Sequence, residues 1–186
     1  FMDLEDFGSP DFVRQLPAVR PATVPEMSGR LPWVIGEYTG ALRQAWRTGR
    51  TTDALRAAVF LAHFAADAHT PLHATRDYNG RMPAVLTPPW TAGAPANGQT
   101  SASKGIHARW ESDLVEAMTG LDTIAVSPER NWTLTATPVP APALQRVAGQ
   151  AAARAVETSW LLVDGVYAAD AAARQAAGWQ DGVPAS

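Results

Sequence analysis

Residue types that ligate metal ions gather in two short stretches of the 186-residue chain: His63, Asp67, His73, His107 and Glu111. The chain has one further histidine, His69, and no cysteine. Without thiolates, zinc is bound in proteins by imidazole nitrogens and carboxylate oxygens. In each stretch a carboxylate follows a histidine by four residues, which places both side chains on one face of a helix. The spacing therefore indicates a metal site built from helical pairs.

Two histidines and one carboxylate around an open position form the ligand set of many catalytic zinc sites, because the open position holds a water molecule. His73, His107 and Glu111 would make one such site, and His63 with Asp67 would make half of another. A single buried histidine or glutamate is more often part of a core or a salt bridge. Two pairs together favour the metal interpretation. The alternative from another class is a non-catalytic metal-binding or partner-binding helical domain.

Hydrophobic periodicity predicts the helices that would position these side chains. Helices are expected over residues 33–48, from residue 51 to just beyond Asp67, and over 103–118, 142–166 and 168–177. Gly49 ends the first, residues 51–53 offer an N-cap to the second, and Pro71 stops the second. No segment reads as a strand and no internal repeat is present. The chain, 1–186, is therefore predicted to be one all-α domain.

Both ligand pairs are expected on buried helix faces. The second helix carries an apolar stripe: Leu55, Val59, Ala62 and Ala66. The helix over 103–118 carries a stripe that includes two ligands: His107, Glu111, Leu114 and Met118. The face of His63 and Asp67 is continuous with the first stripe. A carboxylate such as Glu111 within a buried stripe is costly unless it is paired or binds a metal.

Composition excludes several classes of protein. The net charge is −3 and no basic patch is present, so stable binding of duplex DNA is not expected. The absence of cysteine excludes disulfides and thiolate metal sites. No run of about 18 apolar residues is present, so no transmembrane segment is expected. Residues 1–30 should be irregular, and the long connections 74–104 and 121–140 should be loops, of which the first is expected to be functional.

The order and spacing of the ligands resemble the zinc-dependent phospholipase C superfamily, which also contains the single-strand-specific zinc nucleases. The matching stretches are His63-Phe64-x-x-Asp67, Thr70-Pro71-Leu72-His73 and His107-x-x-Trp110-Glu111. The family pattern is H-F-x-G-D-x-x-Q-P-L/M-H followed by H-x-x-x-D/E. Here Ala66 replaces the glycine and Thr70 the glutamine. Arg76 and Tyr78 make the chain more similar to bacterial members than to plant or fungal nucleases.

The resemblance implies an all-α fold of the phospholipase C/nuclease type and hydrolysis of phosphate esters by up to three zinc ions. His63 would bind the first zinc, and Asp67 would bridge the first and third and so have a catalytic role. The second zinc would be held by the remaining ligands: His73, His107 and Glu111. His69 is not a ligand in the family and is interpreted as a hydrogen-bonded loop histidine. Glutamate at the last ligand position resembles phospholipases, whereas the nucleases usually have aspartate.

The first residues, Phe1-Met2-Asp3-Leu4-Glu5, resemble the family segment H-F-x-D-x-E/D after its leading histidine. An upstream segment that completes the site is therefore expected. In the family, an aromatic and an acid here form a base pocket in nucleases, and aromatics near this place face a choline head group in lipases. Phe1 and Asp3 are thus candidate substrate-binding residues. Alternatively, Phe1 is a core residue and Asp3 caps a turn.

The substrate implied by the resemblance is a phospholipid or a single-stranded nucleic acid. Members of this superfamily are mostly secreted. A secreted or periplasmic location is therefore expected, on the resemblance alone.

Overall fold

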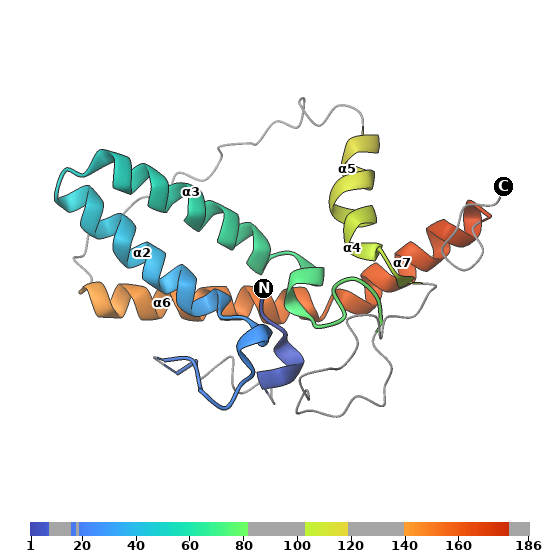
Figure 1. Cartoon of the computed structure of the whole chain (residues 1–186), viewed down its shortest axis with the longest axis horizontal. Coiled ribbons are helices and arrows are strands. Elements are labelled where there is room, and N and C mark those ends of the chain that lie inside the picture. Colours follow the sequence, from blue (N-terminus) through green and yellow to red (C-terminus); the bar gives the residue numbers. More distant parts are fainter. Residues whose placement is uncertain (8–15, 18, 82–102, 119–139, 179–186) are drawn as a thin grey trace.

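The computed structural model describes residues 1–7, 16–17, 19–81, 103–118 and 140–178 (Figure 1). Within these residues the regular structure is helical, apart from one isolated bridge between Met2 and Gly29, so the predicted all-α class is confirmed. No helix in this part of the chain is long and apolar enough to cross a membrane. Most of the two predicted connections, over 82–102 and 119–139, lies outside the described residues.

The longest helices described are α2 (Leu31–Arg47), α3 (Thr51–Ala68), α6 (Ala141–Trp160) and α7 (Val163–Ala176). Short 3₁₀ helices accompany them: η1 (Leu4–Phe7), η2 (Glu26–Ser28) and η3 (Pro71–Ala74). The helix predicted over 103–118 consists of three successive segments: α4 (Ile106–Ala108), the π-helical turn η5 (Arg109–Asp113) and α5 (Leu114–Ala117). We call these three segments together the ligand helix.

Helix α2 packs against both α3 and α6, as Figure 1 shows. Glycines permit its close approach to α6. A Cβ at Gly36 would lie 2.7 Å from the carbonyl oxygen of Gln145, and a Cβ at Gly149 would lie 3.0 Å from that of Pro32. Helices α2 and α6 therefore form a tightly packed base for α3 and for the turn that follows it.

The junction between α2 and α3 agrees with the sequence in one respect and differs in another. Gly49 directly follows the end of α2 with φ at 71°, in the left-handed region that glycine adopts without strain. The predicted N-cap within residues 51–53 is wrong, because Arg50 precedes α3 and makes no side-chain cap hydrogen bond. Asp53 forms an ion pair with Arg50 instead, with 3.2 Å between Oδ2 and Nη1.

The apolar stripe predicted to be buried on α3 is exposed. Leu55 is 63% exposed and Val59 is 68% exposed. The residues that α3 buries are alanines: Ala54, Ala57 and Ala68. Small side chains let the helix approach its neighbours closely, so the alanine face meets the core. The stripe predicted around Glu111 is not buried either, because η5 and α5 contain no buried residue.

The single helix predicted over 142–166 is wrong, because Leu161 and Leu162 separate α6 from α7. The two helices pack into different hydrophobic clusters. Val156 of α6 belongs to the cluster formed with α2 and α3, whereas Val163 of α7 belongs to a second cluster. The sequence has no glycine or proline at this break. The break depends instead on which cluster each helix contacts.

Candidate metal centre

His73 lies in η3, which sits between the two hydrophobic clusters. Leu72 belongs to the cluster that α7 forms, and Ala74 belongs to the cluster of α2, α3 and α6. Pro71 begins the turn with its fixed backbone angle, and the amide of Met2 donates to the carbonyl of His73 at 3.0 Å. The backbone of His73 is therefore held on both sides, and its side chain is only 10% exposed.

His107 and Glu111 lie on the ligand helix. Gly105, with φ at 82°, turns the chain into this helix, and Ile106 is fully buried at its start. The turn that contains Glu111 is π-helical, and π turns occur frequently at functional sites. His107 Nε2 lies 3.2 Å from Glu111 Oε1, so the predicted pair is formed.

Three of the predicted ligands converge from these two elements. His73 Nε2 lies 3.0 Å from His107 Nε2 and 3.1 Å from Glu111 Oε2. Donors at about 2.0–2.1 Å from a tetrahedral zinc ion are about 3.3 Å apart, so the observed spacing is close to that of a bound set. Although Glu111 Oε1 lies near His107, this buried atom has no hydrogen-bond partner among the described residues, and a bound cation would supply one interaction for it. The three residues could therefore hold a metal ion.

Asp67 supports this group through His73. Its Oδ1 lies 3.0 Å from His73 Nδ1, and its side chain is largely buried. A ligating histidine usually donates its second ring N–H to a carboxylate, which fixes the tautomer and orients the ring. Asp67 is therefore placed to leave the Nε2 lone pair of His73 free for a ligand bond.

The other two histidines lie outside the three-donor group. The side chain of His63 is 69% exposed, and its Nε2 lies 3.5 Å from Asp67 Oδ2. The structure thus brings His63 and Asp67 together, and a metal role for that pair stays a prediction. His69 has its Nδ1 2.7 Å from the carbonyl oxygen of Ala65, which agrees with its interpretation as a hydrogen-bonded histidine.

The protonation of His73 suits metal binding. Burial lowers the pKa of its imidazole, and the neighbouring His107 acts in the same direction, against the opposite effects of Glu111 and Asp67. Metal ions bind the neutral form of histidine. The lowered pKa therefore keeps His73 in its ligand form near neutral pH.

Two partly exposed aromatic rings border the ligands. The ring centroid of Phe1 lies 4.1 Å from that of His73, and the ring centroid of Tyr78 lies 5.6 Å from that of His107. Phe1 and Tyr78 both remain about half exposed, so Phe1 is not a core residue. The two rings offer a surface for a planar or cationic group beside the metal ligands.

Asp3 takes part in a turn through its backbone. Its amide donates to the carbonyl of Ser28 and its carbonyl accepts from the amide of Asp6, both at 3.0 Å. Burial, together with repulsion from Asp6 and Glu5, raises the pKa of the Asp3 carboxyl to about 7. The interpretation of Asp3 as a turn residue therefore agrees with its backbone hydrogen bonds. Its role in substrate binding stays a prediction.

Two acids to which the sequence assigned no role link the elements around the site. Glu5 accepts hydrogen bonds from Trp160 Nε1 at 3.0 Å and from the amide of Arg76 at 3.3 Å. Asp170 of α7 is 5% exposed and pairs with Arg109 of the ligand helix. Asp170 continues the apolar face of α7, and an acid on an apolar face is the signal that could have identified it. Glu5 is the acidic position of the first segment that resembles the family pattern, so a signal was present, although it predicted no contact with Trp160 or Arg76.

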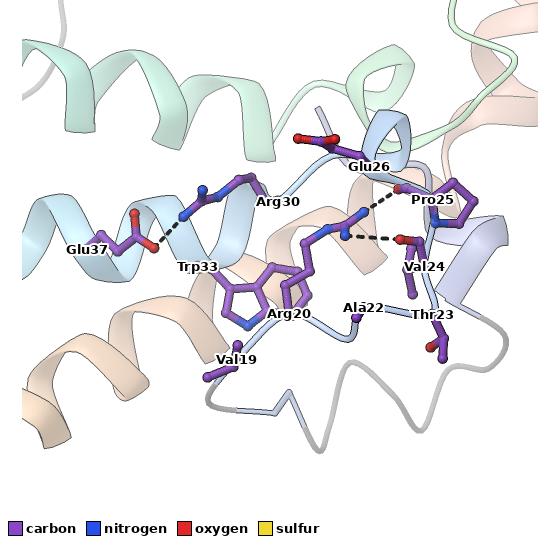
Figure 2. A pocket seen from close by; sticks show the side chains of 10 residues that line it. All are labelled: Val19, Arg20, Ala22, Thr23, Val24, Pro25, Glu26, Arg30, Trp33 and Glu37. Atoms are coloured by element: carbon purple, nitrogen blue, oxygen red, sulfur yellow. Dashed lines mark hydrogen bonds and ion pairs between the residues drawn. The ribbon is translucent and has the colours of Figure 1, made fainter.

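A cavity of about 610 Å³ lies away from the ligands, between the segment 19–26 and the start of α2 (Figure 2). The guanidinium of Arg20 donates to the backbone carbonyls of Val24 and Pro25 in its wall. None of the predicted ligands lines this cavity. It therefore forms no part of the metal centre.

Comparison of the chain with protein-family models, with curated proteins and with solved structures finds no match. The candidate site is therefore defined by its own geometry. It consists of His73 from η3 and of His107 and Glu111 from the ligand helix, arranged so that together they could hold one metal ion.

Proposed function

We propose that the chain is a zinc-dependent hydrolase of phosphate esters, a phosphodiesterase of the phospholipase C type. The observation that supports this proposal is the convergence of His73, His107 and Glu111, whose donor atoms all lie within 4.8 Å of one another. Two imidazoles and one carboxylate are a typical ligand set of catalytic zinc, which keeps its fourth position for water or substrate. The resemblance of the ligand motifs leads to the same reaction.

Zinc fits this donor set better than magnesium or calcium, because those ions prefer oxygen ligands throughout. When bound, zinc supplies stabilisation of negative charge on phosphoryl oxygens and a water molecule whose pKa is lowered toward about 7. This chemistry suits the hydrolysis of a phosphodiester, since it needs no serine or cysteine nucleophile.

The chain's own residues would hold and orient the reacting groups. His73, His107 and Glu111 would bind the ion, and Asp67 would keep His73 in the tautomer that presents Nε2. By the resemblance, His63 and Asp67 would also serve a further zinc ion, and Asp67 would then have a catalytic role. The distance of 3.5 Å between His63 Nε2 and Asp67 Oδ2 is compatible with that use.

The substrate would be a phospholipid or a single-stranded nucleic acid. The rings of Phe1 and Tyr78 beside the ligands suit either one, because a ring can stack on a base or face a quaternary ammonium group. Asp3 would contact the base edge in the nucleic-acid case. The second candidate function is a non-catalytic metal-binding domain, and it is favoured by the single three-donor group among the described residues.

Chelator-treated protein, assayed before and after addition of zinc, tests the proposal. The substrates are bis-p-nitrophenyl phosphate, phosphatidylcholine vesicles and single-stranded DNA. We expect zinc-dependent hydrolysis of at least one of them, abolished by Glu111→Gln and retained by the matched control His69→Gln. Zinc binding without hydrolysis of any substrate would leave the non-catalytic candidate. Absence of zinc binding would contradict both.

A further inference from the structure

The ligand helix has little apolar anchorage of its own. Ile106 is buried at its start and Trp110 packs against the second hydrophobic cluster, but η5 and α5 bury no residue. So short a helix is not stable in water by intrinsic propensity. The orientation of His107 and Glu111 therefore depends on the polar contacts that this helix makes.

Arg109 makes the main contact of this kind. It lies between the two ligands in the sequence, and its guanidinium binds Asp170 of α7 at two points. Nε lies 2.8 Å from Oδ1 and Nη2 lies 2.8 Å from Oδ2. The remaining nitrogen, Nη1, donates to the carbonyl of Lys104 at 2.7 Å, just before the helix begins. A two-point bond of this type fixes orientation as well as distance.

Asp170 is itself firmly placed. Its side chain is buried, and its Oδ2 also accepts a hydrogen bond from Arg174 Nε at 2.9 Å, one turn further along α7. A buried carboxylate that loses a cationic partner keeps the full cost of its desolvation. The pair of Arg109 and Asp170 is therefore a rigid link between the ligand helix and α7, and Figure 1 shows the two helices meeting at the start of α4.

Helix α7 also contacts the segment that follows His73. The hydroxyl of Tyr167 donates to the carbonyl of Asp77. Arg81 lies over the ring of Tyr167 at 4.3 Å and forms an ion pair with Asp164. The ligand helix and the segment after His73 thus both contact α7, so α7 is a common support for these two parts of the chain.

We propose that Asp170 is a positioning residue of the metal site, which acts through Arg109 to hold His107 and Glu111 at the spacing that a metal ion requires. The inference rests on the metal-binding part of the proposed function and not on hydrolysis. It follows that Asp170 controls metal affinity although it is no ligand.

The variant Asp170→Asn tests this role, because it keeps the size of the side chain and removes its charge. Zinc affinity, measured by competition with a chromophoric chelator, should fall about 10-fold, the lower end of the range for groups bonded directly to a metal ligand, because Asp170 acts through Arg109. Asp113→Asn is the matched control, since it makes the same change at an exposed carboxylate of the ligand helix, and its zinc affinity should stay near wild type. Cobalt in place of zinc reports coordination geometry, so its visible absorption should change in Asp170→Asn alone.

Wild-type zinc affinity and a wild-type cobalt spectrum in folded Asp170→Asn, checked by circular dichroism, would overturn the proposal. If that variant does not fold, Arg109→Lys takes its place, because it keeps a positive charge beside Asp170 and loses the two-point bond. Unchanged zinc affinity in Arg109→Lys would equally overturn it. Zinc binding without hydrolysis in the wild-type protein contradicts only the proposed function, whereas no zinc binding contradicts both.

Discussion

The same pair occurs twice in this chain, as a histidine followed four residues later by a carboxylate. On the ligand helix, His107 and Glu111 meet the ring of His73, and the three donors lie 3.0–3.2 Å apart. On α3, His63 and Asp67 are 3.5 Å apart, and His63 is mostly exposed. The same spacing therefore belongs to a three-donor group at the ligand helix and to a pair with a mostly exposed histidine on α3.

The difference lies in what each pair meets. His73 comes from a turn fixed between two hydrophobic clusters, and it points Nε2 at the pair on the ligand helix. Asp67 lies on the other side of the same ring and bonds its Nδ1. His73 therefore connects the two pairs. Its Nε2 is a possible metal ligand beside His107 and Glu111, and its Nδ1 bonds Asp67 of the other pair.

Replacement of His73 should have the largest effect. His73→Ala removes one of three donors and the bond to Asp67, so zinc affinity should fall by more than about 100-fold, beyond the range for outer partners. Isothermal titration of the metal-free protein with zinc measures it. His69→Ala, which changes a histidine outside the group, should bind zinc as the wild type does. Equal loss in both variants would contradict the assignment of His73.

Replacement of Asp67 distinguishes support from ligation. Asp67→Asn should lower zinc affinity about 10- to 100-fold, because the amide no longer fixes the tautomer of His73. The number of zinc ions bound per chain should stay the same. A decrease in that number, measured by elemental analysis after dialysis, would show instead that Asp67 is a ligand, as the resemblance implies.

Acidification should destabilise the metal-free protein through His73. Its pKa is lowered from 6.5 in the folded state, mainly by burial, so the unfolded chain binds more protons as the pH falls below that value. The contribution of His73 to the free energy of unfolding should therefore decrease as the pH passes down through about 6.5, whereas the Asp3 carboxyl, whose pKa is raised to about 7, contributes in the opposite direction. Urea unfolding of the wild type and of His73→Gln at several pH values isolates the contribution of His73, because Asp3 is common to both proteins. A wild type that gains stability relative to His73→Gln on acidification would contradict the lowered pKa of His73.

Replacement of His63 should have the smallest effect. The side chain is exposed, so His63→Ala should change the free energy of unfolding by no more than about 0.5 kcal/mol. Zinc affinity of the three-donor group should equal that of the wild type. If zinc affinity fell as far as it does in Asp67→Asn, the two pairs would form one site rather than two unlike ones.

Much of the fold was predictable because its signals are local. Gly49 and Pro71 mark helix ends through backbone geometry, which does not depend on distant contacts. Burial was not predictable in this way. Leu55 and Val59 have the periodicity of a buried stripe, but the closest packing of α3 uses its alanines. The break between α6 and α7 was missed for the same reason, because it depends on which cluster each helix contacts.

The sequence by itself determined the ligand types and their pairing, since a spacing of four residues places two side chains on one helix face whatever surrounds it. It also indicated His73 as the partner of His107 and Glu111. Only the tertiary structure decided that His63 stays exposed, that Asp67 bonds His73, and that Asp170 holds the ligand helix. These features join residues far apart in the chain, such as Arg109 and Asp170, 61 positions apart, and such contacts exist only once the helices have packed.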